Sequence, residues 1–240
     1  MSRSMAEDRF AAADAAHFHW TTADPGFAPV EEALLGPRLG ALAFPCLEIG
    51  CGEGTNLVRL ARRGQPFGID RSLARARFAA RAVPGAHLAA ADAHALPFRD
   101  GVFASVLIRD LLHHLVEPRR AAVEAVRVLA PGGTLLVIEP NGRNPFVALQ
   151  ARFVPAERGL RRFTPSFVMA ALEGLPLAER VLEMAQGFPL RRLLLHYRFG
   201  WPSVGRTRAA ARVLERLERL GERLLPPARW SYTVVRSRRR

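Results

Sequence analysis

The sequence of 240 residues contains no lysine, so all 35 of its basic residues are arginine. It has only two cysteines, Cys46 and Cys51, which are too few and too close together for a disulfide framework. We expect both to be small buried side chains. No stretch reaches the roughly 18 continuous apolar residues of a membrane-spanning helix, and the polar first ten residues do not resemble a secretory signal. These absences predict a single metal-free domain in the cytoplasm.

Acidic residues are scarce in one part of the chain. Residues 1–140 contain 15 arginines and 15 acidic residues, whereas residues 141–240 contain 20 arginines and 7 acidic residues. The whole net charge of +13 therefore lies in the last 100 residues. Compositional bias explains the arginines, which are abundant throughout, but not the loss of acids. A basic region of this kind indicates an anionic partner, such as a membrane surface or a nucleic acid.

Short apolar runs alternate with helical patterns between residues 44 and 140. Strands are expected at 44–50, 66–70, 86–92, 102–110 and 134–140. Helices are expected at 55–64, 72–85 and 110–133, the last interrupted by a proline at position 118. This alternation predicts a parallel sheet with helices on both faces, in which ligands bind at the carboxyl ends of the strands. The expected strand ends share polar side chains that mark one crevice: Glu48, Asp70, Asp92, Arg109 and Glu139.

Three glycines, Gly50, Gly52 and Gly54, alternate directly after the first expected strand. Their spacing differs from the G-x-G-x-x-G of dinucleotide-binding loops, and Glu48 beside them disfavours a phosphate and favours a cationic group. An ionised carboxylate accepts two hydrogen bonds, so Asp70 suits two ribose hydroxyls. Asp92, at the end of the next expected strand, could accept a hydrogen bond from the exocyclic amine of a base. The pattern predicts a ligand with a cation, a ribose and a base; helix capping is the alternative role of Asp70 and its counterpart at position 92.

The segments LEIGCGEG, GID, ADAHALPFRDGVFASVLIRDLLHHL and VLAPGGTLLVIEP resemble, in order and spacing, the motifs of class I S-adenosylmethionine-dependent methyltransferases. The likeness is greatest to the small-molecule, quinone-biosynthesis-like subgroup, and it covers about residues 10–187. It implies a Rossmann-like doubly wound sheet of seven mostly parallel strands with an antiparallel last strand. It also implies S-adenosyl-L-methionine as the cofactor, with the aromatic segment HFHW at 17–20 covering it.

The resemblance implies roles for the residues around the glycines. Glu48 and the backbone of Gly50 and Gly52 would face the methionine part of the cofactor, within the loop that ends at Gly54. The backbone carbonyl of Arg109 would meet the methionine amine. These five residues are therefore expected at one end of the cofactor.

Residues at the ends of the second and third expected strands would bind the other end of the cofactor. By the same resemblance, Asp70 would hold the ribose hydroxyls, Asp92 the adenine amine and the Ala93 amide a ring nitrogen. Arg71 departs from the family, where an apolar residue packs on the adenine; its planar guanidinium could stack there instead.

His113 and His114 follow the fourth expected strand, at the rim of the crevice. One hypothesis is that these histidines supply a general base. The alternative is that they are core or cofactor-lining side chains. The sulfonium cofactor is already an activated methyl donor, so holding the acceptor in line can suffice for catalysis. A base is needed only where the acceptor loses a proton.

We expect one methyltransferase domain over 1–240, with a helical cover at 1–43, a cofactor-binding core at 44–140 and acceptor-side elements at 141–240. The last part contains a helical insertion at about 189–228. Within it, residues 207–225 form an amphipathic helix, expected to pack on the body, with a lid, a dimer seam or a membrane-surface helix as alternatives. Its apolar stripe comprises Val213, Leu214, Leu217, Leu220 and Leu224.

The leading hypothesis is an enzyme that methylates a small, lipophilic or aromatic metabolite and makes transient contact with anionic membranes. An RNA methyltransferase is the first alternative, disfavoured because residues 201–229 contain a single aromatic residue, Trp201. The second is a cofactor-binding partner subunit without catalysis, disfavoured because the cofactor motif is intact. The pattern leaves the oligomeric state and the methylated atom open.

Overall fold

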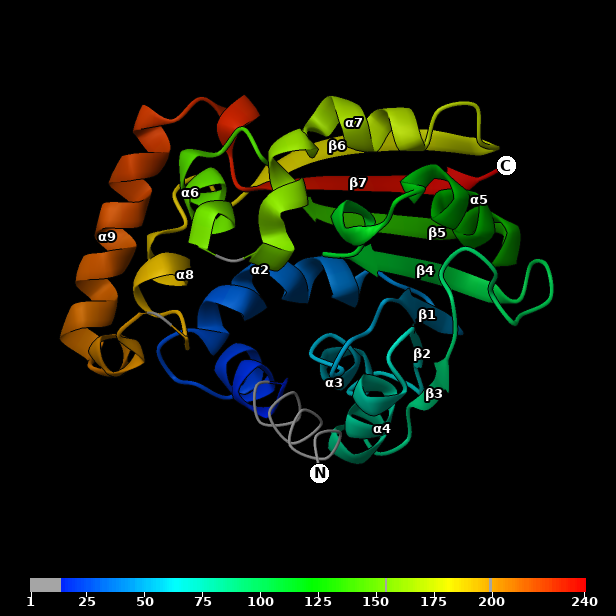
Figure 1. Ribbon diagram of the computed structural model, residues 1–240, viewed down its shortest axis with the longest axis horizontal. Helices are drawn as coiled ribbons and strands as arrows, with labels where there is room; N and C mark the ends of the chain where they lie inside the picture. Colours follow the sequence, from blue (N-terminus) through cyan, green and yellow to red (C-terminus); the bar gives the residue numbers. More distant parts are fainter. Residues whose placement is uncertain (1–13, 154, 199) are drawn as a thin grey trace.

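The computed structural model describes residues 14–153, 155–198 and 200–240. Its centre is a seven-stranded sheet with strand order β3-β2-β1-β4-β5-β7-β6 (Figure 1). Strands β1 to β5 pair in parallel, and β7 runs antiparallel to both β5 and β6. The predicted doubly wound sheet with an antiparallel last strand is therefore confirmed. The strands are β1 (Cys46–Ile49), β2 (Phe67–Asp70), β3 (His87–Ala90), β4 (Phe103–Arg109), β5 (Leu129–Pro140), β6 (Leu177–Ala185) and β7 (Tyr232–Arg239).

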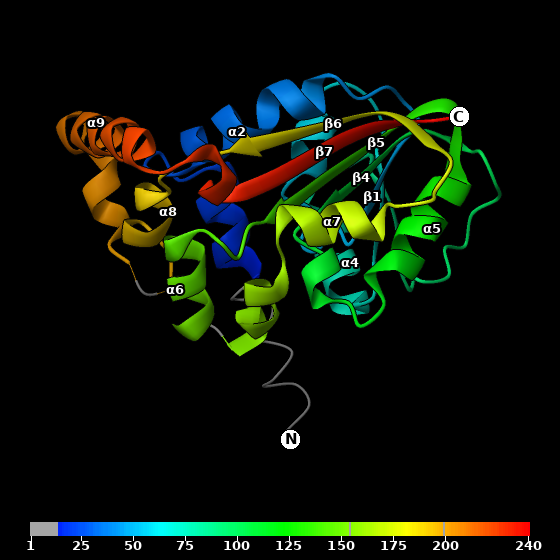
Figure 2. The same ribbon diagram turned by 90° about the horizontal axis from the view of Figure 1, so that it is seen from above.

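Helices cover both faces of this sheet, with α2 on one face and α5 and α7 on the other (Figure 2). Residues 14–22 are also helical. The helices are α2 (Ala28–Gly40), α3 (Leu57–Leu60), α4 (Leu73–Ala82), α5 (Pro118–Val128), α6 (Pro145–Phe153), α7 (Pro165–Ala171), α8 (Leu190–Leu194) and α9 (Arg208–Leu224). Short 3-10 turns are η1 (Leu112–His114), η2 (Pro155–Arg162), η3 (Pro202–Arg206) and η4 (Pro227–Arg229).

Two apolar cores lie against the sheet. One joins strand residues such as Phe103 to Ala121 of α5 and Val168 of α7, all fully buried. The other joins strands to Leu35 of α2 and Leu57 of α3, also fully buried. Each fully buried leucine contributes about 1.5–3 kcal/mol. Packing on both faces holds the carboxyl edge of the sheet in place.

A side-chain hydroxyl caps the first turn of helices α4 and α7. Ser72 accepts a hydrogen bond from the Arg75 amide at 3.3 Å, and Thr164 accepts one from the Phe167 amide at 3.3 Å. Each hydroxyl satisfies one of the unpaired amides in the first helical turn.

The segment 110–133 differs from the prediction of one long helix. The turn η1 comes first, α5 begins at Pro118, and β5 begins already at Leu129. Pro118 occupies the first helical turn, where its missing N–H costs nothing, so it starts the helix instead of interrupting it. Similarly, α3 covers only four residues of the helix predicted at 55–64.

Two helices of the C-terminal part lie beyond one end of the sheet. Helices α8 and α9, which lie between β6 and β7 in sequence, lie past the end at which β4 and β5 finish (Figure 1). Of the cover predicted at 1–43, residues 1–13 lie outside the described residues. Within the described ranges, no helix is both long enough and apolar enough to cross a membrane.

Candidate active site

The loop after β1 turns through three left-handed glycines. Gly50, Gly52 and Gly54 have φ values of 77°, 53° and 91°, a region that side-chain-bearing residues rarely adopt. A Cβ at Gly50 would lie 2.8 Å from Leu111, and one at Gly54 would lie 3.1 Å from Ala79. At Gly52 the same Cβ would meet no atom within 4 Å. The backbone of Gly52 therefore borders open space at the carboxyl edge of the sheet.

Glu48, on β1 just before this loop, is buried with one oxygen unsatisfied. Its Oε1 accepts a hydrogen bond of 2.5 Å from Asn56 Nδ2, whereas Oε2 is buried without a hydrogen-bond partner among the described residues. Burial raises the pKa of Glu48 to about 8, although the bond from Asn56 opposes this. A buried acceptor without a partner is costly, so this oxygen suits a donor on a bound ligand, and a cationic amine above all.

Asp70 ties the glycine loop to helix α4. Its Oδ2 accepts from the Gly52 amide at 2.9 Å and its Oδ1 from the Ser72 amide at 2.8 Å. Because Ser72 caps α4, Asp70 is not the capping residue. Each carboxylate oxygen has two lone pairs, so the half-buried Asp70 can still accept hydrogen bonds from a ligand's hydroxyls.

Asp92 lies one strand further along the same edge, two residues beyond β3. This exposed side chain accepts from the amide of His94 at 2.9 Å and lies 2.7 Å from His94 Nδ1. These hydrogen bonds, with a smaller contribution from Arg71, lower the pKa of Asp92. Arg71 is itself exposed, and Ala93 is buried beside Asp92. The predicted ribose and adenine residues therefore lie at adjacent strand ends.

A buried chain of polar contacts runs from Glu48 along the carboxyl edge of the sheet, the region that we call the crevice. Arg109, at the end of β4, donates from Nη1 to Asn56 Oδ1 at 2.8 Å and from Nη2 to Glu31 Oε2 at 2.6 Å. The other oxygen of Glu31 pairs with Arg192 of α8. Burial alone would raise the pKa of Glu31, but the two arginines lower it to about 2. Side chains of β1, β4, α2 and α8 are thus joined in one network.

Sequence reasoning missed most of this network. Glu31 and Arg192 are 161 residues apart in sequence, and no spacing rule links them. Asn56 is only eight residues from Glu48, yet its place in the turn before α3 carries no recognisable pattern.

Asp110 is a further residue that the sequence reasoning missed. It directly follows β4 and has a left-handed φ of 50°, which costs a residue with a side chain about 1–3 kcal/mol. Its Oδ2 lies 3.2 Å from Arg109 Nε, and its Oδ1 is buried without a hydrogen-bond partner among the described residues. Burial raises the pKa of Asp110. A strained backbone and an unsatisfied oxygen at this strand end mark it as part of the site.

The two predicted histidines differ in their surroundings. His113 is buried, and its Nδ1 lies 2.7 Å from Glu139 Oε2, whereas His114 is exposed. Glu139 also accepts the amides of Leu111 and Leu112 at 2.9 and 2.7 Å. Donation of Nδ1–H to the carboxylate makes Nε2 the basic nitrogen of the His113 ring. Glu139 therefore both holds the η1 turn and orients His113.

The part of the chain that carries these residues is similar to known proteins. Residues 47–137 match the model of the family described as methyltransferase domain. A phosphatidylethanolamine N-methyltransferase of Cereibacter sphaeroides is 30% identical over 153 residues, which are 60% of this chain and 73% of that protein. The chain belongs to the class I S-adenosylmethionine-dependent methyltransferases. The cofactor of this family is S-adenosyl-L-methionine, and the unsatisfied Glu48 oxygen beside the open face of Gly52 fits its amine end.

Other relatives match a smaller part of their own length. A demethylmenaquinone methyltransferase of Renibacterium salmoninarum is 37% identical over 94 residues, 39% of this chain and 40% of that protein. A 23S rRNA (guanine(748)-N(1))-methyltransferase of Streptomyces fradiae is 38% identical over 123 residues, 48% of this chain and 41% of that protein. The chain thus spans less than half the length of these two relatives.

The fold of this chain is also that of solved structures. A SAM-dependent methyltransferase from Archaeoglobus fulgidus superposes with a TM-score of 0.65 at 17% identity, covering 93% of this chain and 99% of that one. The fold is therefore shared over nearly the whole chain, including the elements that follow residue 140.

The helix at residues 14–22 lies against the glycine loop. His17 pairs with Glu53, between the second and third glycines, and Arg59 donates to the Thr21 carbonyl at 2.7 Å. Trp20 stacks on Phe27 at 3.8 Å between ring centroids. The segment 17–20 therefore forms an aromatic wall beside the loop.

Neither cysteine has the properties of a nucleophile. Cys46 and Cys51 are free and buried. Burial raises the pKa of Cys46 to about 12 and that of Cys51 further above its usual range, so both remain thiols at neutral pH. Among the residues that the structure describes, no group of three or more His, Cys, Asp or Glu could hold a metal ion.

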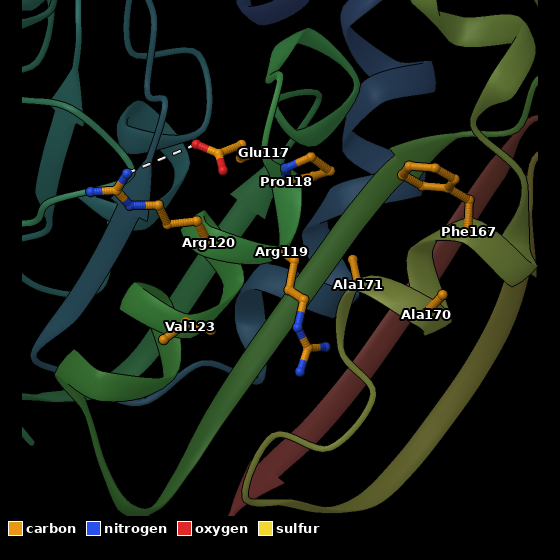
Figure 3. Close-up of a pocket in the computed structure, with 8 residues that line it drawn as sticks. All are labelled: Glu117, Pro118, Arg119, Arg120, Val123, Phe167, Ala170 and Ala171. Carbon is orange, nitrogen blue, oxygen red and sulfur yellow. Dashed lines mark ion pairs between the residues drawn. The ribbon is translucent and has the colours of Figure 1, made fainter.

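A groove of about 590 Å³ lies outside the crevice, between α5 and α7. Figure 3 shows Arg119 and Val123 of α5 on one side and Phe167 and Ala171 of α7 on the other. It contains none of the predicted cofactor residues. The groove is therefore separate from the candidate active site at the carboxyl edge of the sheet.

Proposed function

We propose that the protein transfers the methyl group of S-adenosyl-L-methionine to a small, lipophilic or aromatic acceptor. The observation that carries the cofactor part is the buried, unsatisfied Oε2 of Glu48 beside the open face of Gly52. Asp70 and Asp92 lie at the next two strand ends, so a cation, a ribose and a base can be read in order along one edge.

The proposed cofactor contacts follow this order. Glu48, the Gly50–Gly54 loop and the backbone carbonyl of Arg109 hold the methionine part. Asp70 accepts from the ribose hydroxyls, and Asp92 and the Ala93 amide take the adenine edge. Arg71 lies over the adenine face. We further propose that the described part of the predicted cover, residues 14–43, covers this site and that residues 141–240 supply the acceptor side of the domain.

The bound cofactor supplies an activated methyl group, so the protein must mainly position the acceptor. We assign proton removal, for a hydroxyl acceptor, to His113. Its ring is oriented by Glu139 in the way that a general base requires. We also propose that His114, which is exposed in the same turn, contacts the acceptor.

Two features support a lipophilic or aromatic acceptor. The names of relatives cited above include demethylmenaquinone and phosphatidylethanolamine as substrates. In this chain, an aromatic cluster stands beside the glycine loop: the His17 ring lies 5.9 Å from Trp20 and 5.5 Å from Tyr197 between centroids. Trp20 is itself buried, so the half-buried rings of His17 and Tyr197 supply the apolar surface that this cluster offers to a quinone, a phenol or an acyl chain.

Calorimetry tests the cofactor. S-adenosylmethionine should bind with a micromolar Kd, roughly −7 to −8 kcal/mol, and NAD should not bind. Incubation with tritiated cofactor and a lipid extract should then label the lipid fraction. His113→Gln should lower kcat about a hundredfold at neutral pH while leaving cofactor affinity unchanged. NAD binding without S-adenosylmethionine binding would refute the proposal.

RNA methylation is the second candidate, because the rRNA methyltransferase of Streptomyces fradiae is 38% identical over 123 residues and the C-terminal part is basic. Supplying total RNA beside the lipid extract separates the two substrates. Tritium in the RNA fraction, with RNA affinity falling steeply as salt rises, would favour this candidate. Cofactor binding without transfer to either fraction would favour a non-catalytic subunit.

A further inference from the structure

Helix α9 exposes most of its apolar stripe. Val213, Leu217, Leu220 and Leu224 are 54%, 46%, 56% and 78% exposed, and only Leu214 of the predicted stripe is buried. The expectation that this stripe packs on the body is therefore wrong for four of its five residues. We call the four exposed residues the α9 ridge.

The helix packs through a different face. Glu218 accepts from the Arg191 amide at 2.7 Å and from its Nε at 2.6 Å. Gly221 lies so close to Phe188 that a Cβ at this position would clash with the ring. With Leu214, these contacts hold α9 on α8 and on the segment before it, and they turn the α9 ridge away from the body.

Arginines border the α9 ridge. At about 100° per residue, the four ridge residues fall within an arc of about 60°, and five arginines fall within an adjoining arc of about 80°. All five are exposed. Glu215 and Glu222 lie on the far side of this arc. We call these five residues the arginine row: Arg208, Arg212, Arg216, Arg219 and Arg223.

We propose that α9 docks on an anionic lipid surface, with the α9 ridge in the acyl boundary and the arginine row at the phosphates. An exposed apolar stripe bordered by basic residues is the pattern of an interfacial helix, and arginine side chains can reach the headgroups while their stems stay in apolar surroundings. A second copy of the chain fits less well, because it would bring the same arginine row, and no acidic row, beside its own ridge.

The position of α9 suits this role. Both views show it at the outer end of the molecule, on the far side of α8 from the sheet (Figures 1 and 2). This is the end at which β4 and β5 finish and the active site lies. The docking proposal rests on the surface of α9 and goes beyond the proposed function; a lipophilic acceptor would make such docking useful.

Vesicle sedimentation tests the docking. The protein should bind vesicles of phosphatidylglycerol and phosphatidylcholine but not of phosphatidylcholine alone, and some binding should persist in high salt because of the α9 ridge. The double variant Leu217→Gln/Leu220→Gln should lose affinity at least about tenfold. Its control is Leu73→Gln/Leu182→Gln, which changes leucines that are 51% and 46% exposed elsewhere and should bind like the wild type.

A second pair of variants tests the charge. Arg212→Gln/Arg216→Gln should weaken binding at low salt by roughly fivefold for each arginine. The control Arg77→Gln/Arg81→Gln removes two exposed arginines at the same spacing from α4 and should have a much smaller effect.

Three results would overturn the proposal. The first is no binding to the anionic vesicles at low salt, and the second is equal loss in the α9 variants and their controls. The third is a dimer, seen by light scattering, that Leu217→Gln/Leu220→Gln converts to a monomer, because the α9 ridge would then be a dimer seam. Calorimetric cofactor binding should be unchanged in every variant. Its absence in the wild type would count against the proposed function and not against the docking.

Discussion

The crevice and helix α9 use arginine in opposite ways. In the crevice, Arg109 and Arg192 are desolvated and share the carboxylate of Glu31. On α9 the arginine row is exposed, and its contacts with acids are long, as between Arg219 and Glu215 at 3.5 Å. Buried arginines thus join elements of the fold, whereas exposed ones remain available to an external anion. Net charge alone does not separate these two uses.

The largest expected effect comes from removing the carboxylate that the buried arginines share. Glu31→Ala should lower the free energy of unfolding by about 3–5 kcal/mol, because two buried guanidinium groups lose their counterion. Chemical denaturation measures the loss. The matched change on α9, Glu215→Ala, should cost less than about 1 kcal/mol. Equal costs would show that the network contributes no more than a surface ion pair.

Asp70→Ala should lower cofactor affinity by about 2–4 kcal/mol, because charge-assisted hydrogen bonds to the ribose are lost. The variant also releases the Gly52 amide, which Asp70 holds at 2.9 Å. Calorimetry with S-adenosylmethionine gives the change, and thermal unfolding shows whether the variant is folded. Asp100→Ala, an exposed carboxylate paired with Arg127 at 2.7 Å, is the control and should bind the cofactor normally. Unchanged affinity in folded Asp70→Ala would place the ribose elsewhere.

Glu48 makes the crevice sensitive to pH. Its pKa of about 8 lies above the ordinary value of 4.5, so the folded cofactor-free protein binds a proton that the unfolded chain has lost. Stability should therefore fall by roughly 2–4 kcal/mol as pH rises from 5 to 8. Denaturant titrations across this window measure the fall, and Glu48→Gln should flatten it. Because a cationic ligand favours the carboxylate, cofactor affinity should rise over the same window; a slope that Glu48→Gln leaves intact would assign it to another group.

The smallest effect is expected on α9. Leu217→Gln/Leu220→Gln should change the free energy of unfolding by no more than about 0.5 kcal/mol, because both side chains already face solvent. In the core, Leu35→Ala should cost about 2–5 kcal/mol. Denaturation of both variants measures the contrast. A large loss in the α9 variant would mean that the α9 ridge is covered in solution.

The order of elements could be predicted well from local pattern. The apolar runs around Leu47, Ile69 and Val106 became β1, β2 and β4, because buried parallel strands need continuous apolar residues. The error at 110–133 came from reading helical spacing through Pro118 and on into Leu129, where the chain enters the sheet. A proline and an apolar run allow either outcome, and pairing with the neighbouring strand decides between them.

The candidate site likewise contains some residues that could be predicted from the sequence and others that could not. Glu48, Asp70 and Asp92 could be placed at one edge from sequence, because parallel strands end on the same side of a sheet. The roles proposed for them stay predictions until the cofactor is bound. The partners Glu31 and Arg192 could not be found, since they meet only after α2 and α8 pack over the crevice.

The sequence by itself determined the sheet, the glycine turn, the acidic strand ends and the amphipathic character of α9, because each depends on the spacing of residues that are close along the chain. Only the tertiary structure decided which arginines are buried, which oxygen of Glu48 lacks a partner and which face of α9 meets solvent. The physical reason is that burial and ion pairing depend on neighbours brought from distant parts of the chain. Gly221 and Phe188, by their close contact, turn the α9 ridge outward.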